Sequence, residues 1–83
     1  MTTLQYPIAT EKAINMIERD NVITYIVDMR SNKADVKKEF EDSFKVKVQR
    51  VNIMIETKNR KRAYITLKKE FKASDIALKL KLV

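Results

Sequence analysis

The stretch KVKVQRVNIMIETKNRKRAYITLKKEFK, residues 45–72, contains two runs of β-branched and aliphatic residues on either side of a polar segment. The apolar runs are Val46–Ile55 and Ala63–Leu67, and the polar segment between them is Glu56–Arg62. Two such runs around a short polar segment predict a β-hairpin. The two-residue Asn-Gly turn that marks the strongest hairpin signals is absent here.

This hairpin stretch also contains the excess of positive over negative charge in the chain. It holds ten Lys and Arg residues against two Glu, a net charge of +8, whereas residues 1–44 carry −2 and residues 73–83 carry +1. Crowding like charges costs self-repulsion, which binding to phosphates offsets because it releases condensed counterions. The pattern favours a polyanion partner, contacted by the basic tip residues Lys58, Arg60, Lys61 and Arg62. The alternative is a solvated basic face that prevents edge pairing.

Composition excludes several classes of function. The 83 residues include no Cys, no His and no Gly, so a thiolate metal site, a histidine base and a glycine-rich phosphate loop are all missing. We therefore expect no catalytic residues, no metal site and no cofactor. The length predicts one domain, residues 1–83, with a small core.

Hydropathy gives an expectation about location. No apolar run approaches the roughly 20 residues of a membrane span. The first residues, MTTLQYPIATEK, lack the basic and apolar regions of a signal peptide. We expect a cytoplasmic protein with no direct membrane insertion.

The remaining elements follow from residue periodicity. Leu4–Ile8 carries a proline and is expected to be a short edge strand or an extended lead-in. Val22–Met29 has apolar residues on both faces, with Met29 on the same side as Ile23, and is expected to be a central strand. Three helices are predicted at Glu11–Arg19 after the cap Thr10, at Lys33–Phe44 after Ser31 or Asn32, and at Asp75–Leu80.

These elements predict an α+β fold. Three to four antiparallel strands form a small sheet, the strand Val22–Met29 lies beside the hairpin, and about three helices pack on the sheet.

Two details of the hairpin bear on binding. The alternation of apolar residues changes phase at Gln49-Arg50, which predicts a β-bulge that re-aims Arg50. Tyr64 lies on the same side of its strand as Arg62, so it is positioned to stack on a base or ribose. Alternatively, Tyr64 packs on Tyr25 across the sheet.

The helix Lys33–Phe44 has two charged sides. Lys33 and Lys37 sit one turn apart and are either phosphate contacts or an ordinary solvated face. An acidic set is expected on the solvent side, where it offers a surface for recruiting protein partners; its members are Glu39, Glu41 and Asp42.

Several segments together resemble a known family. Residues 6–12, YPIATEK, are similar to the "P-x-x-T-E-K" opening of the large-subunit ribosomal protein family L twenty-three. Residues 31–37 and 44–52 resemble its "N-K-x-x-I-K … F-x-V-x-V-x-x-V-N-T" run, and residues 61–67, KRAYITL, resemble its "K-K-A-Y-V-x-L" ending. Ile53 replaces the usual Thr, and the short tip Glu56–Arg60 looks archaeal rather than bacterial in type.

The resemblance implies a cytoplasmic ribosome component that binds large-subunit rRNA of the 23S type near the polypeptide exit tunnel. It implies neighbouring ribosomal proteins as partners, and a docking site for exit-site factors such as the signal recognition particle, chaperones and the translocon. Glu11 falls at the family's docking position. The motif match also implies RNA contacts at Lys12, Asn32, Lys33, Lys37 and Asn52, which join Arg50, Lys58, Arg60, Lys61, Arg62 and Tyr64 as candidates.

Two other functions remain open from the residues alone. The same basic hairpin suits a free-standing RNA-binding or chaperone-type module. The acidic helix side suits a protein-interaction adaptor. Co-sedimentation with the large subunit separates the ribosomal role from both.

Overall fold

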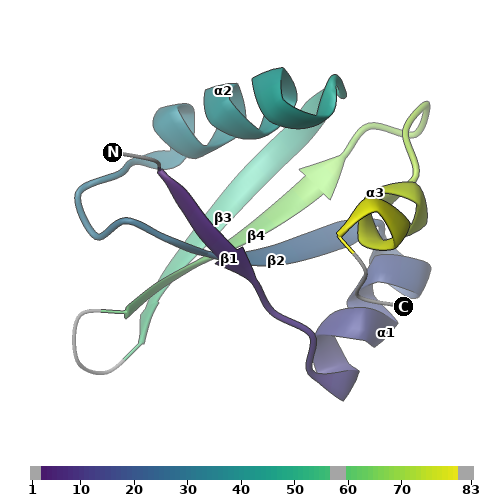
Figure 1. Cartoon of the computed structure of the whole chain (residues 1–83), viewed down its shortest axis with the longest axis horizontal. Helices are drawn as coiled ribbons and strands as arrows, with labels where there is room; N and C mark the ends of the chain where they lie inside the picture. The colour runs from purple at the N-terminus through teal and green to yellow at the C-terminus, as the bar shows by residue number, and fades with distance from the viewer. Residues whose placement is uncertain (1–2, 57–59, 81–83) are drawn as a thin grey trace.

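The computed structural model describes residues 3–56 and 60–80. Its four strands form one antiparallel sheet in the order β1-β2-β4-β3, and the three helices pack on that sheet (Figure 1). The predicted α+β class is confirmed. In chain order the elements are β1 (Leu4–Pro7), α1 (Glu11–Asp20), β2 (Val22–Val27), α2 (Lys33–Phe44), β3 (Val48–Glu56), β4 (Arg60–Leu67) and α3 (Ala73–Lys79).

The helices begin where capping groups are available. Thr10 accepts a hydrogen bond from the amide of Ala13 at the start of α1. Asn32, not Ser31, caps α2 through a reciprocal pair of hydrogen bonds with Asp35. Helix α3 begins two residues earlier than expected, because the side chain of Asn21 accepts a hydrogen bond from the amide of Ala73 at 2.6 Å.

Strand β2 is interior, between β1 and β4, as predicted, and all six of its residues are buried. It ends at Val27 rather than Met29. The carboxylate of Asp28 accepts a hydrogen bond from the amide of Arg30, and its carbonyl accepts one from the amide of Ser31, which turns the chain. Met29 therefore lies outside the strand and is exposed, so its predicted place in the strand beside Ile23 was wrong.

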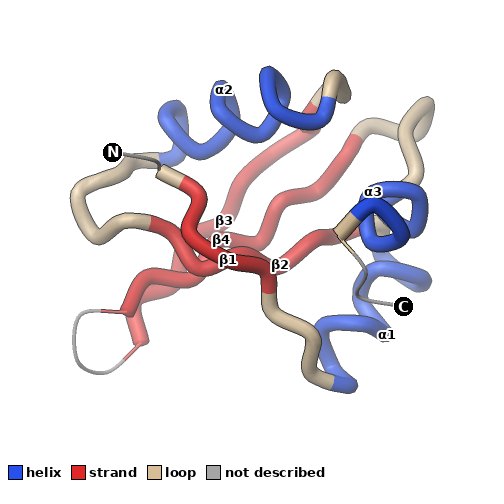
Figure 2. Tube along the Cα trace, in the orientation of Figure 1, coloured by secondary structure: helices blue, strands red, loops and turns tan. Residues whose placement is uncertain are grey.

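The core lies on one side of the sheet. Helix α2 packs against β3, whereas α1 packs against β2 and α3 at the other end (Figure 2). Ile23, Tyr25 and Val27 of β2 face these helices, and the ring of Tyr25 meets Phe40 edge-on at 6.3 Å between centroids. Burial, together with the nearby Glu39 carboxylate, raises the pKa of the Tyr25 phenol. The other side of the sheet is thus left with less helical cover.

Candidate nucleic-acid interface

The β-bulge predicted at Gln49-Arg50 is present. Val48 pairs with Leu67 and Arg50 with Thr66, so two residues of β3 oppose one of β4. Before the bulge Val48 is buried in the core, and after it Val51 is buried in turn. Because of the extra residue, Arg50 is exposed on the side of the sheet opposite the core.

Cross-strand pairing defines this second face of the sheet. Residues directly opposite one another in antiparallel strands project to the same side. One row across the three strands is Val22, Thr66 and Arg50; the next is Thr24, Tyr64 and Asn52.

Tyr64 and Tyr25 lie on opposite faces. Tyr64 pairs with Thr24, whereas Tyr25 pairs with Ala63 and faces the core. The suggested packing of Tyr64 on Tyr25 is therefore wrong, because the two positions differ in strand parity.

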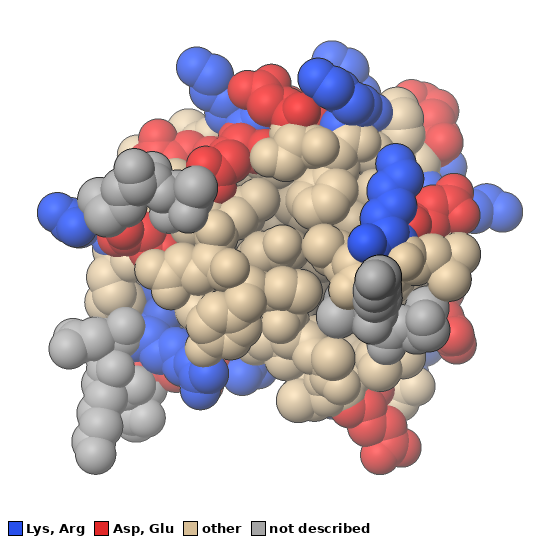
Figure 3. Space-filling model, in the orientation of Figure 1, with Lys and Arg blue, Asp and Glu red and all other residues tan. Residues whose placement is uncertain are grey.

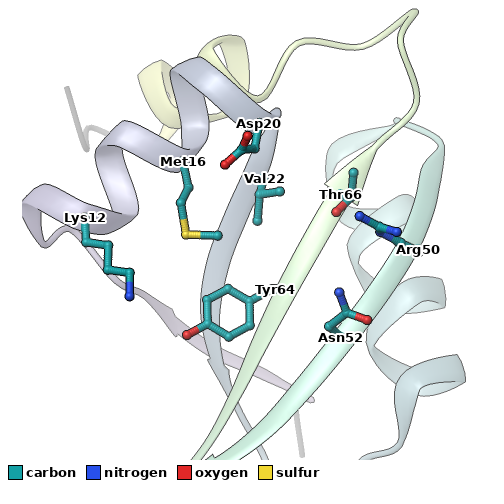
Figure 4. A pocket seen from close by; sticks show the side chains of 8 residues that line it. All are labelled: Lys12, Met16, Asp20, Val22, Arg50, Asn52, Tyr64 and Thr66. Atoms are coloured by element: carbon teal, nitrogen blue, oxygen red, sulfur yellow. The ribbon is translucent and has the colours of Figure 1, made fainter.

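Helix α1 forms a wall beside the second face. Lys12, Met16 and Asp20 follow one another at intervals of four residues and so share one side of α1. This stripe and the second face enclose a groove of about 420 Å³ (Figure 4). Its lining consists of Lys12, Met16, Asp20, Val22, Arg50, Asn52, Tyr64 and Thr66. The α1–sheet groove brings four of the predicted RNA contacts together, namely Lys12, Arg50, Asn52 and Tyr64.

The charges in the α1–sheet groove are available to a ligand. Lys12 and Arg50 are exposed, and within residues 3–56 and 60–80 neither forms an ion pair. The Asp20 carboxylate oxygen Oδ2 lies 3.7 Å from Nε of Arg19. Both side chains are well exposed to solvent, where such an ion pair contributes little to stability. Asn52 is exposed, while Tyr64 is half-buried.

Two tip arginines already have partners within the chain. The guanidinium of Arg62 lies 2.7 Å from the Glu56 carboxylate and donates to the Tyr64 hydroxyl, a hydrogen bond that raises the pKa of Arg62. Arg60 donates to the hydroxyl of Tyr6 and lies 5.8 Å from the centre of its ring. That hydrogen bond raises the pKa of Arg60.

Lys61 projects to the side opposite Arg62. Its ammonium donates hydrogen bonds to the carbonyls of Met29 and Ser31, in the turn before α2. Neighbouring strand residues point to opposite faces, so the basic tip does not form one continuous patch. Lys58 lies outside the described residues.

The α2 candidates lie apart from the α1–sheet groove. Lys33 and Lys37 are exposed on α2, which packs against β3, and neither lines the groove. Asn32 is occupied as the helix cap. Glu11, the first residue of α1, is exposed and does not line the groove either.

Two of the three acidic residues assigned to the solvent side of α2, Glu39 and Glu41, instead hold backbone groups of the chain. The carboxylate of Glu39 accepts hydrogen bonds from the amides of Thr3 and Leu4, and that of Glu41 accepts one from the amide of Val48 at 2.7 Å. Both side chains thus satisfy backbone donors at strand ends. Asp42 remains exposed.

Sequence reasoning missed half of the lining of the α1–sheet groove. Met16, Asp20, Val22 and Thr66 were not singled out for binding. The spacing of four between Lys12, Met16 and Asp20 was a usable signal, because it places all three on one side of a helix.

Surface charge is distributed around the rim in the view of Figure 3. Lys, Arg, Asp and Glu side chains ring the visible face, and its centre is free of them. Within the described parts of the chain, no helix combines the length and apolarity needed to cross a membrane.

Comparison with known proteins gives a consistent result. The profile of a family described as Ribosomal protein L23 matches residues 2–79. The large ribosomal subunit protein uL23 of the archaeon Methanothermobacter thermautotrophicus is 46% identical over 74 residues, which cover 89% of this chain and 86% of that protein.

Proposed function

The chain belongs to the ribosomal protein L23 family, and on that premise we propose that it binds large-subunit rRNA through the groove between α1 and the second face of the sheet. Membership makes it a ribosomal protein of the large subunit that serves translation as a structural constituent rather than as a catalyst. The proposal concerns how this constituent is held in place. In this proposal, residues 1–83 act as one RNA-binding domain.

The convergence of four groove residues carries the proposal. Lys12 comes from α1, Arg50 and Asn52 from β3, and Tyr64 from β4, yet all four line one groove. Cations attract phosphates, an amide reads base edges, and an aromatic ring stacks on an unpaired base. The bulge at Gln49 positions Arg50 with the other three.

A second contact region is proposed on and beside α2. Lys33 and Lys37 are exposed one turn apart and suit two neighbouring phosphates. Asn32 and Lys61 support the turn and cap that begin this helix. Arg60 and Arg62 keep their charge beside tyrosine hydroxyls, and with Lys58 they contribute a weaker, longer-range attraction to RNA.

Sedimentation of extracts from the source cells tests the ribosomal role. We expect the protein to co-sediment with the large subunit at one copy per particle and to withstand washing at moderate salt. The Arg50→Gln and Lys12→Gln double variant should compete poorly with the unaltered protein for incorporation. A protein found only in the slow fractions would instead be a free-standing RNA-binding module.

The exit-site role is proposed for Glu11. This exposed carboxylate begins α1 yet lies outside the groove, and phosphate would repel it, whereas Arg or Lys on a protein partner would pair with it. We propose that it contacts exit-site factors of the signal recognition particle, chaperone or translocon type.

Replacing Glu11 should separate the two roles. Glu11→Ala is expected to leave incorporation into ribosomes intact and to weaken co-sedimentation of an exit-site factor, more strongly at low salt. Helix stability should change by less than about 1 kcal/mol, because the Thr10 cap remains. The matched control is Glu18→Ala on the same helix. Lost assembly with unchanged factor affinity per ribosome would make Glu11 a structural residue.

A further inference from the structure

The α1–sheet groove has the size and lining of a site for a single nucleotide. Its volume of about 420 Å³ falls in the range of roughly 300–1,000 Å³ typical of small-ligand pockets. A duplex hides the faces of its bases, whereas an unpaired nucleotide exposes them. We propose that the groove holds one unpaired nucleotide of the bound RNA, and that guanine is the base it favours. This rests on the RNA-binding function proposed above.

Two side chains can sandwich a base. Met16 from α1 and Tyr64 from β4 extend into the same space between helix and sheet (Figure 4). The flat face of Tyr64 provides a stacking surface. The flexible, polarisable thioether of Met16 adapts to the other face of an inserted ring.

The charge pattern indicates a base edge at one end of the groove. A plain phosphate track would be lined by cations alone, but Asp20 lies on the wall that also carries Lys12. An ionised carboxylate only accepts hydrogen bonds, so the exposed Asp20, whose pair with Arg19 is weak, can accept one from a donor on the ligand. Guanine presents two adjacent N–H donors, N1–H and the 2-amino group, on its Watson–Crick edge, whereas adenine and cytosine each offer one amino group. Lys12 and Arg50 then neutralise the flanking phosphates.

A buried hydroxyl without a partner supports a ligand at this place. Thr24 is 2% exposed, and its Oγ1 has no hydrogen-bond partner among the described residues. Such a group is costly unless something satisfies it. Thr24 lines a small cavity of about 20 Å³ that shares Lys12, Met16 and Tyr64 with the groove. That volume admits one water, through which a bound ribose or base can reach the hydroxyl.

Kethoxal probing of the RNA tests the inference directly, because this reagent modifies N1 and N2 of unpaired guanines. The full-length protein is bound to large-subunit rRNA, and its footprint is compared with that of naked RNA. We expect one unpaired guanine to become protected. Replacing that guanine by inosine, which lacks the 2-amino group, should weaken binding roughly tenfold, as expected for a lost hydrogen bond to a charged group.

Protein variants link the protected base to the α1–sheet groove. Tyr64→Leu should weaken protection about fivefold or more, the lower limit for losing one stacked base, whereas Tyr64→Phe keeps the ring and should retain it. Asp20→Asn should weaken binding, and it should add little to the inosine effect because both remove the same contact. Glu18→Gln, also exposed on α1, is the matched charge control.

The possible outcomes are distinguishable. RNA binding with no guanine protected in a Tyr64-dependent way would overturn the nucleotide site and leave the proposed function intact. Loss of protection on addition of equimolar guanosine monophosphate would assign the groove to free nucleotides and overturn the RNA assignment. Failure of the unaltered protein to bind the RNA at all would refute the proposed function itself. The inosine substitution needs no protein variant, so a misfolded Tyr64→Leu protein leaves the test decisive.

Discussion

Asn21 joins three elements through one side chain. It ends α1 in the left-handed region, at φ 60°, a conformation that Asn tolerates better than most residues. Its amide nitrogen donates to the carbonyls of Leu67 and Phe71 at 3.2 and 2.9 Å, and its amide oxygen accepts from the amide of Ala73 at 2.6 Å. The end of β4 and the start of α3 are therefore fixed to the end of α1.

Removing this side chain should be among the most destabilising changes away from the core. Three hydrogen bonds of about 0.5–1.5 kcal/mol each give an expected loss of about 3 kcal/mol for Asn21→Ala, measured by urea unfolding. Asn21→Gly loses the same bonds but keeps easy access to positive φ, so it should be about 1 kcal/mol less damaging. Equal losses for the two variants would show that backbone strain is irrelevant here.

Single residues were predictable where the interaction is local. Thr10 was recognised as a cap, and Asn32 was one of two candidates, because a cap and its amide partner lie within three residues. The bonding role of Asn21 was not predicted, because its partners are 46 to 52 residues away. Glu39 and Glu41 were placed in solvent for the same reason: their partners are backbone amides brought near only by folding. That the Thr24 hydroxyl is buried without a hydrogen-bond partner among the described residues likewise could be seen only in the packed structure.

At the scale of elements, the bulge of β3 serves both sides of the sheet. In this nine-residue strand, Val48 before the bulge and Val51 after the bulge both lie in the core. Arg50 and Asn52 point to the other side and line the groove. Without the extra residue, strict alternation would keep only one half of the strand in its correct orientation.

Deleting Gln49 would restore regular alternation along β3, but it should disrupt the core. One half of β3 would have to expose its buried residues, and losing burial of two aliphatic side chains costs about 3 kcal/mol or more. Thermal unfolding of the deletion variant should show a large fall in Tm. A separate RNA-binding measurement should show a weaker complex. Gln49→Ala keeps the residue count, so its stability should stay within about 0.5 kcal/mol of the unaltered protein. A deletion variant of normal Tm would show that the register can shift freely.

Element order and type followed from the sequence because periodic patterns and caps agree along most of the chain, whereas bounds of β2, β4 and α3 differ from the predicted ones by two or three residues. Helix α2 has the predicted bounds, and the phase change at Gln49-Arg50 revealed the bulge. The shared face of Arg62 and Tyr64 also followed from parity. The tip cations were instead predicted as one cluster, and the structure separates Lys61 from Arg62. The side-by-side placement of α1 and the second face did not follow, because no local pattern specifies which strand a helix packs beside.

At the scale of the whole molecule, the net charge of a segment does not show which of its cations are free to contact a ligand. The hairpin stretch holds the chain's positive excess, yet Arg60, Arg62 and Lys61 contact groups of the chain itself. Lys12 and Arg50, by contrast, have no ion-pair partner within the described residues and share one groove. Specific phosphate contacts should therefore depend on the position of a cation more than on the total charge.

The salt dependence of RNA binding distinguishes position from total charge. The double variant Lys12→Gln and Arg50→Gln should reduce the slope of log K against log salt by about 1.4–1.8, since each phosphate contact contributes about 0.7–0.9. The double variant Lys68→Gln and Lys69→Gln removes the same two charges from exposed positions outside the groove. It should weaken binding slightly and leave the slope almost unchanged. Equal reductions for the two pairs would mean that diffuse charge holds the RNA, and that the α1–sheet groove is not its contact site.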